Sequence, residues 1–122
     1  MTSPFRRVVD PLVVEHRVRA DCAEIELLVP QDLHFFRGHF PGAPVVPGVV
    51  QIKWAIELAR RYLAIAGGFT AMENVKFQRV MTPQSRVKLT LEYAATARKL
   101  HFSFASAEAR YSSGRVILGT AP

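Results

Sequence analysis

One histidine of the sequence, His39, lies where glycine and proline recur at short intervals, in the stretch HFPGAPVVPG. The ordinary pKa of imidazole is near neutrality, so a histidine held in a rigid turn is suited to act as a general base. Pro47 and Gly48 are followed by a largely apolar run from Val49 to Ala59. Because proline is favoured in the first turn of a helix, we predict that a buried helix begins here.

The start of the predicted helix is the second feature of the sequence that is suited to binding or catalysis. The first backbone N–H groups of a helix have no partner within it, and this end carries a partial positive charge. Such donors bind an anion or stabilise negative charge that develops on an oxygen atom during a reaction. His39 and the amide of Gly48 therefore form a candidate site with a base and an oxyanion donor. A purely structural histidine and a simple helix start are the alternatives that these residues leave open.

Two stretches carry a resemblance to a known family. HFPGAPVVPGVVQ resembles the signature loop of the hot-dog-fold 3-hydroxyacyl-(acyl carrier protein) dehydratases, and NVKFQR resembles a strand of the same family. Gln51 and Trp54 also resemble a Q-x-x-W pattern of the aryl polyene dehydratase subgroup. The resemblance implies a lyase of fatty acid or polyene-type biosynthesis. It would dehydrate a 3-hydroxyacyl thioester on acyl carrier protein to the trans-2-enoyl thioester, without a cofactor.

The resemblance also implies a role for each matching residue. His39 matches the catalytic base, and Gly48 matches the residue whose N–H polarises the thioester carbonyl. Val45 matches a position whose backbone carbonyl orients the histidine. The residues expected to contact the substrate surround these positions and are Phe40, Val45, Val46, Pro47 and Trp54.

The acidic catalytic position departs from the family pattern, because Lys53 stands where family members carry Glu or Asp. An ammonium group has an ordinary pKa of about 10.4 and donates a proton poorly unless burial lowers that value. Glu57 lies one helical turn later on the same face. Three interpretations stay open. Lys53 acts as the acid with altered chemistry, Glu57 supplies a carboxylate or pairs with Lys53, or the site binds acyl chains without dehydrating them.

Two functions other than dehydration remain alternatives. In the first, the chain is a non-catalytic acyl-binding subunit that supports an active hot-dog partner carrying the missing carboxylate. In the second, it is an acyl thioesterase, an activity that many hot-dog proteins have. The HFPG stretch and the PGVVQ helix start resemble the dehydratase branch more closely, and release of a free acid would reverse that judgement.

Length and charge narrow the class of protein and of partner. The chain has 122 residues, which suits a single domain spanning residues 1–122, and a net charge of +6. The basic residues are scattered and no nucleic-acid-binding motif is present, so nucleic acid is not the expected partner. Acidic acyl carrier protein, which the resemblance implies, fits the same charge. A solvated basic surface without a specific partner is the alternative.

Other expectations concern location, metals and the lone cysteine. The sequence has no apolar run of the roughly 18 residues that span a membrane, and its start lacks the sustained apolar stretch of a signal peptide. A cytoplasmic protein is therefore expected. His16, His34 and His101 have no partners at metal-ligand spacing, so no metal site is expected. Cys22 is expected to be a small buried residue of a strand.

Hydrophobic periodicity predicts an α+β protein, an antiparallel sheet wrapped around one long central helix. The family resemblance implies the same arrangement, the hot-dog fold. The helix is predicted from about Pro47 to Ala66, ended by Gly67-Gly68. A homodimer or higher oligomer joined at sheet edges is expected, because hot-dog proteins usually associate and an unpaired edge strand is a liability. The predicted strands are Val13–Val18, Glu24–Val29, Thr70–Val80, Arg86–Ala97, Lys99–Ala109 and Arg110–Leu118.

Overall fold

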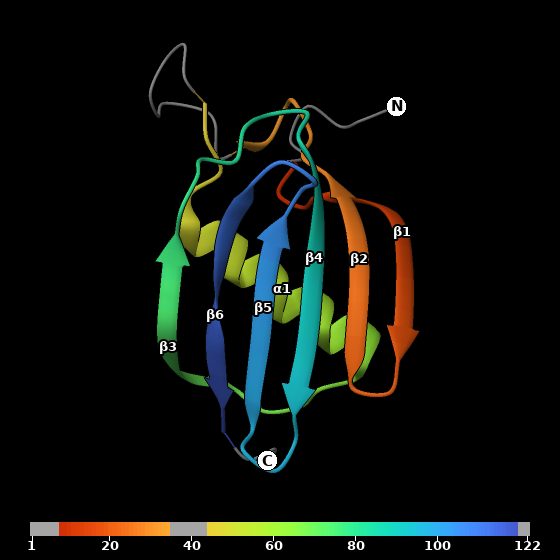
Figure 1. Ribbon diagram of the computed structural model, residues 1–122, viewed down its shortest axis with the longest axis vertical. Coiled ribbons are helices and arrows are strands. Elements are labelled where there is room, and N and C mark those ends of the chain that lie inside the picture. The colour runs from red at the N-terminus through yellow and green to blue at the C-terminus, as the bar shows by residue number, and fades with distance from the viewer. Residues whose placement is uncertain (1–7, 35–43, 120–122) are drawn as a thin grey trace.

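A computed structural model describes residues 8–34 and 44–119 of the chain. In this part, one α-helix lies against one face of a six-stranded antiparallel sheet (Figure 1). The elements in chain order are β1 (Leu12–Arg19), β2 (Cys22–Leu28), α1 (Gly48–Leu63), β3 (Phe69–Phe77), β4 (Arg86–Ala94), β5 (Lys99–Ala105) and β6 (Arg110–Leu118). The predicted α+β hot-dog arrangement is confirmed.

The order of strands in the sheet is β1-β2-β4-β5-β6-β3, so β1 and β3 are its two edges. Each neighbouring pair is antiparallel. The chain passes from β2, on one side of the sheet, through α1 to β3 on the other side. In Figure 1 the helix crosses behind the strands obliquely, beginning on the β3 side and ending on the β2 side. The start of α1 is therefore placed beside the β3–β6 edge of the sheet.

Alternation of apolar and polar side chains decides which face of the sheet meets the helix. In β2, Ala23, Ile25 and Leu27 are buried, whereas Glu24 is exposed and Glu26 half-buried. Successive side chains of a strand point to opposite faces, so the apolar set points toward α1 and the glutamates point away. The same period holds in β4 and β5, whose inward residues are Val87, Leu89, Leu91, Leu100, Phe102 and Phe104.

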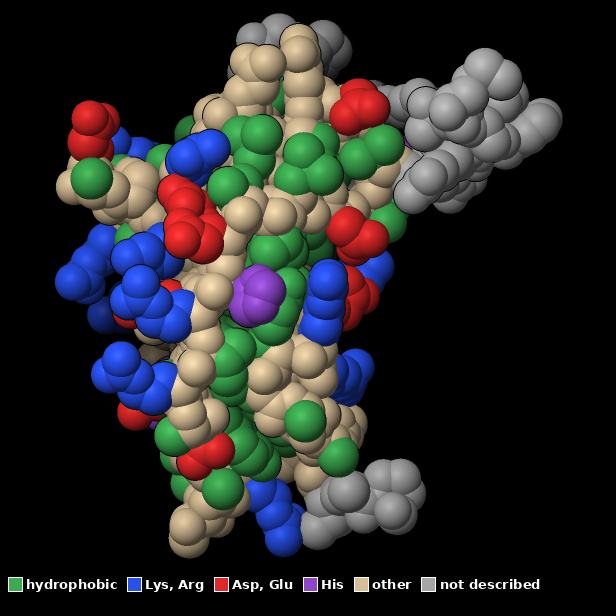
Figure 2. Space-filling model, turned by 90° about the vertical axis from the view of Figure 1, so that its right-hand side faces the viewer, with side chains coloured by type: hydrophobic (Ala, Val, Ile, Leu, Met, Phe, Trp, Pro, Cys, Tyr) green, Lys and Arg blue, Asp and Glu red, His purple; other side chains and the backbone are tan. Residues whose placement is uncertain are grey.

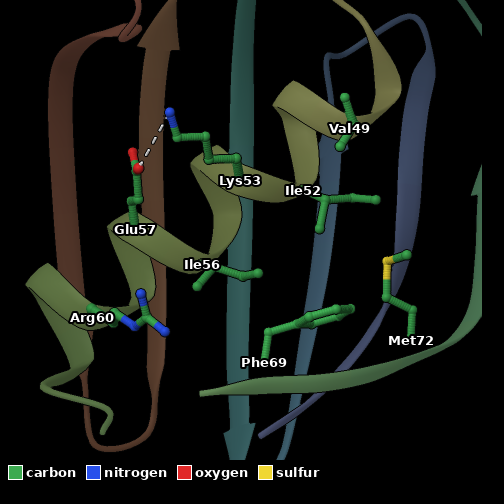
Figure 3. A pocket seen from close by; sticks show the side chains of 8 residues that line it. All are labelled: Val49, Ile52, Lys53, Ile56, Glu57, Arg60, Phe69 and Met72. Carbon is green, nitrogen blue, oxygen red and sulfur yellow. Dashed lines mark ion pairs between the residues drawn. The ribbon is translucent and has the colours of Figure 1, made fainter. Parts of the chain in front are cut away.

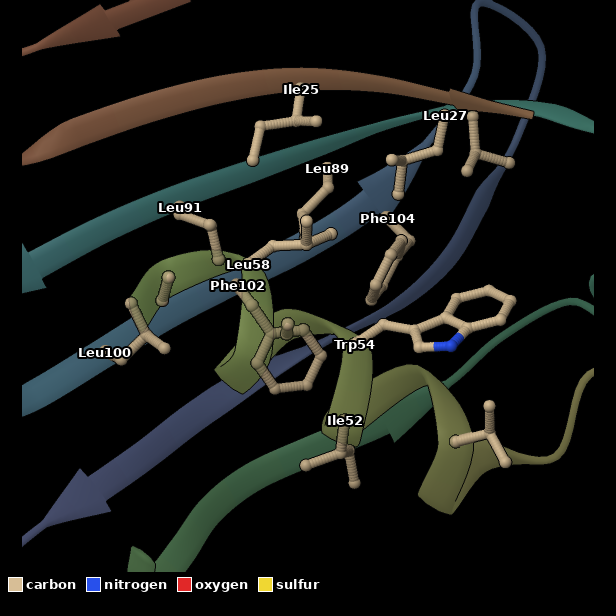
Figure 4. Packing of buried hydrophobic residues seen from close by; sticks show 14 of the residues in the cluster. Ile25, Leu27, Ile52, Trp54, Leu58, Leu89, Leu91, Leu100, Phe102 and Phe104 are labelled. Atoms are coloured by element: carbon tan, nitrogen blue, oxygen red, sulfur yellow. The ribbon is translucent and has the colours of Figure 1, made fainter. Parts of the chain in front are cut away.

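The hydrophobic core lies between this inward face and one side of α1 (Figure 4). Trp54 and Leu58 of the helix pack there with the rings of Phe102 and Phe104. Burying one such apolar side chain contributes about 1.5–3 kcal/mol, so a core of this extent holds the helix firmly on the sheet. A fixed helix gives a fixed direction to the amides at its start.

Some element boundaries differ from the predicted ones because turns take over earlier. The helix ends at Leu63 rather than Ala66, since Ala64 adopts the left-handed conformation with φ 51°. β4 ends at Ala94 rather than Ala97, because the N–H of Arg98 bonds to the carbonyl of Ala95 at 3.2 Å and closes a turn. The predicted extensions of β3 to Val80 and of β5 to Ala109 also lie outside the strands.

The expectation that Cys22 is buried is wrong. Cys22 is the first residue of β2 and is exposed. The physical reason is the parity of the strand: Ala23 and Ile25 point into the core, so residue 22 points outward together with Glu24.

No helix within residues 8–34 and 44–119 is long and apolar enough to cross a membrane. These residues also contain no cluster of three or more His, Cys, Asp or Glu side chains that could hold a metal ion.

Candidate functional site

The start of α1 has the form that the sequence predicted. Pro47 precedes the helix with φ −59° and ψ 147°, and Gly48 is the first helical residue. Pro47 accepts hydrogen bonds on its carbonyl from the N–H groups of Val50 at 3.0 Å and Gln51 at 3.2 Å. The amides of Gly48 and Val49 come before these first intrahelical bonds and point along the axis, out of the helix.

No side chain of the described residues caps this helix start, and its first turn contains no acidic residue. The partial positive charge of the helix end is therefore not neutralised by a neighbouring carboxylate of the first turn. Such a start is suited to stabilise negative charge on an oxygen atom of a bound molecule. His39 and Phe40, the predicted base and one predicted substrate contact, lie outside the described residues.

Residues 45–47, expected to contact the substrate, lead directly into the helix. Val45 and Pro47 are half-buried, and Val46 is buried. The N–H of Val46 donates to the carbonyl of Met81 at 2.8 Å, and its carbonyl accepts from Nε2 of Gln51 at 3.1 Å. Both backbone groups of Val46 are thus fixed, and substrate contact by these residues stays a prediction.

Trp54, the remaining expected substrate contact, lies in the core. Its indole is 1% exposed, and Nε1 donates to the carbonyl of Val9 at 2.9 Å. The neighbouring carbonyl of Val8 accepts from the N–H of His34 at 2.8 Å. Trp54 therefore connects the helix to the segment that holds His34, and a direct contact with substrate stays a prediction.

Lys53 and Glu57 lie together on the rim of an apolar groove between α1 and β3. Their side chains form an ion pair, Nζ to Oε1 at 3.8 Å, and each is about half exposed. Figure 3 shows Phe69 and Met72 of β3 facing α1 across the groove. The groove has a volume of about 430 Å³ and is lined by Val49, Ile52, Lys53, Ile56, Glu57, Arg60, Phe69 and Met72. Of the interpretations left open, the pairing of Glu57 with Lys53 is the one that the structure displays.

Sequence reasoning missed the contribution of β3 and β6 to this region. Phe77 of β3 packs against Gly48, and Ser112 of β6 donates a hydrogen bond to Gln51. The signal for Ser112 was available: residues 112, 116 and 118 alternate inward along β6, so serine stands at a core position. A polar residue at such a position needs a buried partner.

Ion pairs join charged side chains on the outer face of the sheet, the face away from α1. Figure 2 views the β1 side, where Lys and Arg side chains gather along one margin beside Asp and Glu. Several basic residues of the outer sheet face are paired there, such as Arg86 with Glu26 at 3.7 Å and Lys88 with Glu24 at 3.9 Å. On the β3 side of the same face, Lys99 Nζ lies 2.8 Å from Glu73 Oε1.

The pKa of the Glu73 carboxyl is displaced by its charged neighbours. The pKa is lowered from the ordinary 4.5, first because Lys99 donates a hydrogen bond to the carboxylate. The positive charges of Lys99 and Arg115 lower it further, while desolvation opposes them. This cluster lies on the face of the sheet away from α1, because Glu73 pairs in register with the outward Arg115.

Comparisons with known proteins show which family the chain belongs to. The sequence matches the family described as ApeI-like, ApeI dehydratase, over residues 15–115. One relative is the 3-hydroxyacyl-(acyl-carrier-protein) dehydratase FabZ of Erythrobacter litoralis, 33% identical over 60% of this chain and 54% of that protein. FabZ of Rhizorhabdus wittichii is 33% identical over 70% of this chain and 57% of that protein. The chain thus spans little more than half the length of these curated relatives.

Solved structures with a similar fold include one dehydratase. A chain of the dehydratase heterocomplex ApeI:P from Xenorhabdus doucetiae superposes with a TM-score of 0.84 and 30% identity, covering 91% of this chain and 99% of that one. An uncharacterised protein from Erwinia carotovora subsp. atroseptica superposes with a TM-score of 0.77 and 31% identity, covering 89% and 95%. The family match extends over most of the sequence and includes the helix start at Gly48. The chain therefore belongs to the ApeI-like dehydratase family.

Proposed function

We propose that this protein dehydrates a 3-hydroxyacyl thioester carried on acyl carrier protein, giving the trans-2-enoyl thioester. The observation that carries the proposal is the start of α1, where the Gly48 amide points out of a helix without a capping side chain among the described residues. Family membership supports the reaction class. An oxyanion donor suits this reaction, because its intermediate carries enolate-like charge on the thioester oxygen.

Each step has a candidate group. His39 takes the proton from the carbon beside the carbonyl, and the C–H electrons move toward the thioester carbonyl. The N–H of Gly48 donates to the carbonyl oxygen, which becomes more negative in the transition state. The bond between the 3-carbon and its hydroxyl then breaks, and the hydroxyl leaves as water after receiving a proton. The reaction is redox-neutral, so these steps need no redox cofactor.

The candidate sources of the proton for the departing hydroxyl are Lys53, Glu57 and His39. Lys53 occupies the position of the family acid, and its ion pair with Glu57 at 3.8 Å places a carboxylate within reach of the same rim. A lysine ammonium ordinarily has a high pKa and therefore donates a proton poorly. A carboxyl group beside it donates a proton only when the carboxyl itself is protonated. His39 can also return the proton that it has removed.

Product analysis tests the proposal and separates it from hydrolysis. The purified chain is mixed with a 3-hydroxyacyl chain on acyl carrier protein, and the products are resolved by mass. Loss of one water with the thioester intact is the expected result. Release of free 3-hydroxy acid identifies a thioesterase, and an unchanged substrate removes the proposal that this chain dehydrates by itself.

A second candidate function is that of a subunit that needs another hot-dog chain. Two observations favour this function. The family's acidic position is occupied by Lys53, which is paired with Glu57, and one similar structure is a dehydratase heterocomplex. In this case the chain alone leaves the substrate unchanged. Activity then appears on mixing with a hot-dog chain that carries a carboxylate at the matching position, and absence of activity in that mixture contradicts the candidate.

We infer a homodimer formed along β3 and the adjoining groove. β3 is an edge strand, and Phe69 and Met72 present half-exposed apolar side chains beside it. Unpaired apolar edges favour association, and a two-fold interface repeats the same patch on both copies. The test is sedimentation of Met72→Lys against Val18→Lys, since these side chains are 46% and 44% exposed on the two opposite edges. Only the β3 variant is expected to be monomeric, and a dimeric Met72→Lys contradicts the inference.

Acidic acyl carrier protein is proposed to dock on basic residues near the end of β3, the strand whose Phe77 packs against Gly48. Lys76 adjoins Phe77, and the N–H of Arg79 bonds to the carbonyl of Tyr111, next to Arg110. No ion pair within the described ranges engages Lys76, Arg79 or Arg110. Arg79→Glu is expected to raise KM for the carrier-bound substrate but not for a short thioester mimic. An equal effect on both substrates contradicts this docking site.

A further inference from the structure

Gln51 is a buried polar side chain in the first turn of α1. In the described part of the chain, the buried polar or charged residues are Gln51, 3% exposed, and Ser112, 1% exposed. They are bonded to each other, since Ser112 Oγ donates to Gln51 Oε1 at 2.6 Å. A polar group in the core destabilises the fold unless it is hydrogen-bonded, so this pair calls for a reason beyond filling space.

The second hydrogen bond of Gln51 supplies the reason. Nε2 of Gln51 donates to the carbonyl of Val46 at 3.1 Å, and the N–H of Val46 donates to the carbonyl of Met81 at 2.8 Å. Only Pro47 separates Val46 from Gly48, and its ring restricts φ to a narrow range. Fixing both backbone groups of Val46 therefore leaves few conformations for the peptide that carries the Gly48 N–H.

An amide side chain suits this task better than its alternatives. Glutamine offers a donor and an acceptor in one planar group. The Val46 carbonyl can only accept, so the nitrogen of Gln51 must face it and the oxygen must face the Ser112 hydroxyl. An apolar residue of similar size makes neither bond, and an ionised glutamate cannot donate to Val46.

We propose that Gln51 is a positioning residue, held by Ser112, that fixes Val46 and thereby aims the Gly48 N–H at the developing oxyanion. This rests on the function proposed above for its effect on rate, and it gives a physical role to the glutamine of the Q-x-x-W pattern. Gln51 touches no reacting atom in this scheme. Its loss changes the direction of a donor and not the affinity of the site for the acyl chain.

The test compares Gln51→Met with Leu58→Ala in the full chain. Methionine keeps the approximate volume and removes both hydrogen bonds, whereas Leu58→Ala destabilises the same helix nearly three turns from its start. Dehydration of a 3-hydroxyacyl thioester on acyl carrier protein gives kcat and KM. Exchange of the Val46 amide proton, followed by NMR, reports the geometry without any need for activity. Ser112→Ala is the third variant, because it removes the hydroxyl that orients Gln51.

The proposal predicts that kcat of Gln51→Met falls about tenfold to a hundredfold with KM changed less than about twofold, as for a misdirected catalytic group. Val46 exchange becomes faster in Gln51→Met and Ser112→Ala, and Leu58→Ala keeps both kcat and the Val46 exchange rate. Wild-type kcat with wild-type exchange in Gln51→Met overturns the proposal, and so does an equal fall of kcat in Leu58→Ala. If the wild type dehydrates nothing, the proposed function fails, and the Val46 exchange rate alone still decides whether Gln51 fixes this residue.

Discussion

The ring of Phe77 occupies the space that a side chain on residue 48 would need. A Cβ built on Gly48 lies 2.6 Å from two carbon atoms of the Phe77 ring. Contacts this short do not occur between real atoms, so glycine at the helix start permits the end of β3 to pack directly against the first turn of α1. The ring is 53% exposed, so it covers the amide end of the helix from one side while remaining in contact with solvent.

A double-mutant cycle on this contact gives the first prediction. Gly48→Ala forces the Phe77 ring to turn outward and is expected to destabilise the protein. In a Phe77→Ala background the same substitution has room and becomes neutral or stabilising by up to about 1 kcal/mol, since alanine is the better helix former. Urea unfolding of the four proteins measures the coupling. Additive effects of the two substitutions contradict the contact.

Replacing the lysine at the acidic position gives the second prediction. Lys53→Glu restores the carboxylate of the family pattern but loses the ion pair with Glu57. The cost in stability stays below about 1 kcal/mol, because it combines the loss of a half-exposed pair with the repulsion of two carboxylates one turn apart. Lys53→Gln is the matched control, because it also loses the pair and supplies no acid. The enoyl-forming rate of the glutamate variant is expected to exceed that of the glutamine variant about a hundredfold. Equal rates would remove this position from proton transfer.

The Glu73 carboxylate predicts a pH dependence of stability. Its pKa is lower in the folded protein than the ordinary 4.5, chiefly because of the hydrogen bond from Lys99. A lowered folded pKa stabilises the native state above the unfolded pKa, and this contribution is lost as pH falls below 4.5 through the folded pKa. Glu73→Gln should therefore lower Tm at neutral pH and show a shallower loss of Tm on acidification. Parallel Tm curves for the two proteins would mean that Glu73 has no such role.

Much of the fold followed from periodicity because the core faces are strongly apolar. In β2, Ile25 and Leu27 alternate with glutamates, so only one face of the strand can be buried. The apolar run after Pro47 likewise requires a helix packed against the sheet. Strand ends were less predictable, since the turn closed by Arg98 depends on a left-handed backbone conformation at a residue type that rarely adopts it. Residue type alone predicts the wrong burial for Cys22, because the parity of its strand decides that its side chain points outward.

The site was predictable only in part, for a different reason. Pro47, Gly48 and the facing pair Lys53–Glu57 are local along one helix, so spacing alone brings them together. Phe77 and Ser112 reach the same helix start from strands far along the chain, through the register of β3 with β6. Such contacts between distant segments depend on packing of the whole sheet, which no local pattern displays.

The base is the central element of the mechanism, and its removal is the most direct test. The rate of enoyl-thioester formation from a 3-hydroxyacyl chain on acyl carrier protein is compared for the wild type and His39→Ala. Loss of a positioned general base predicts a fall of about 10²- to 10⁴-fold, with the variant as stable as the wild type toward heat. Equal rates in the two proteins would contradict the account.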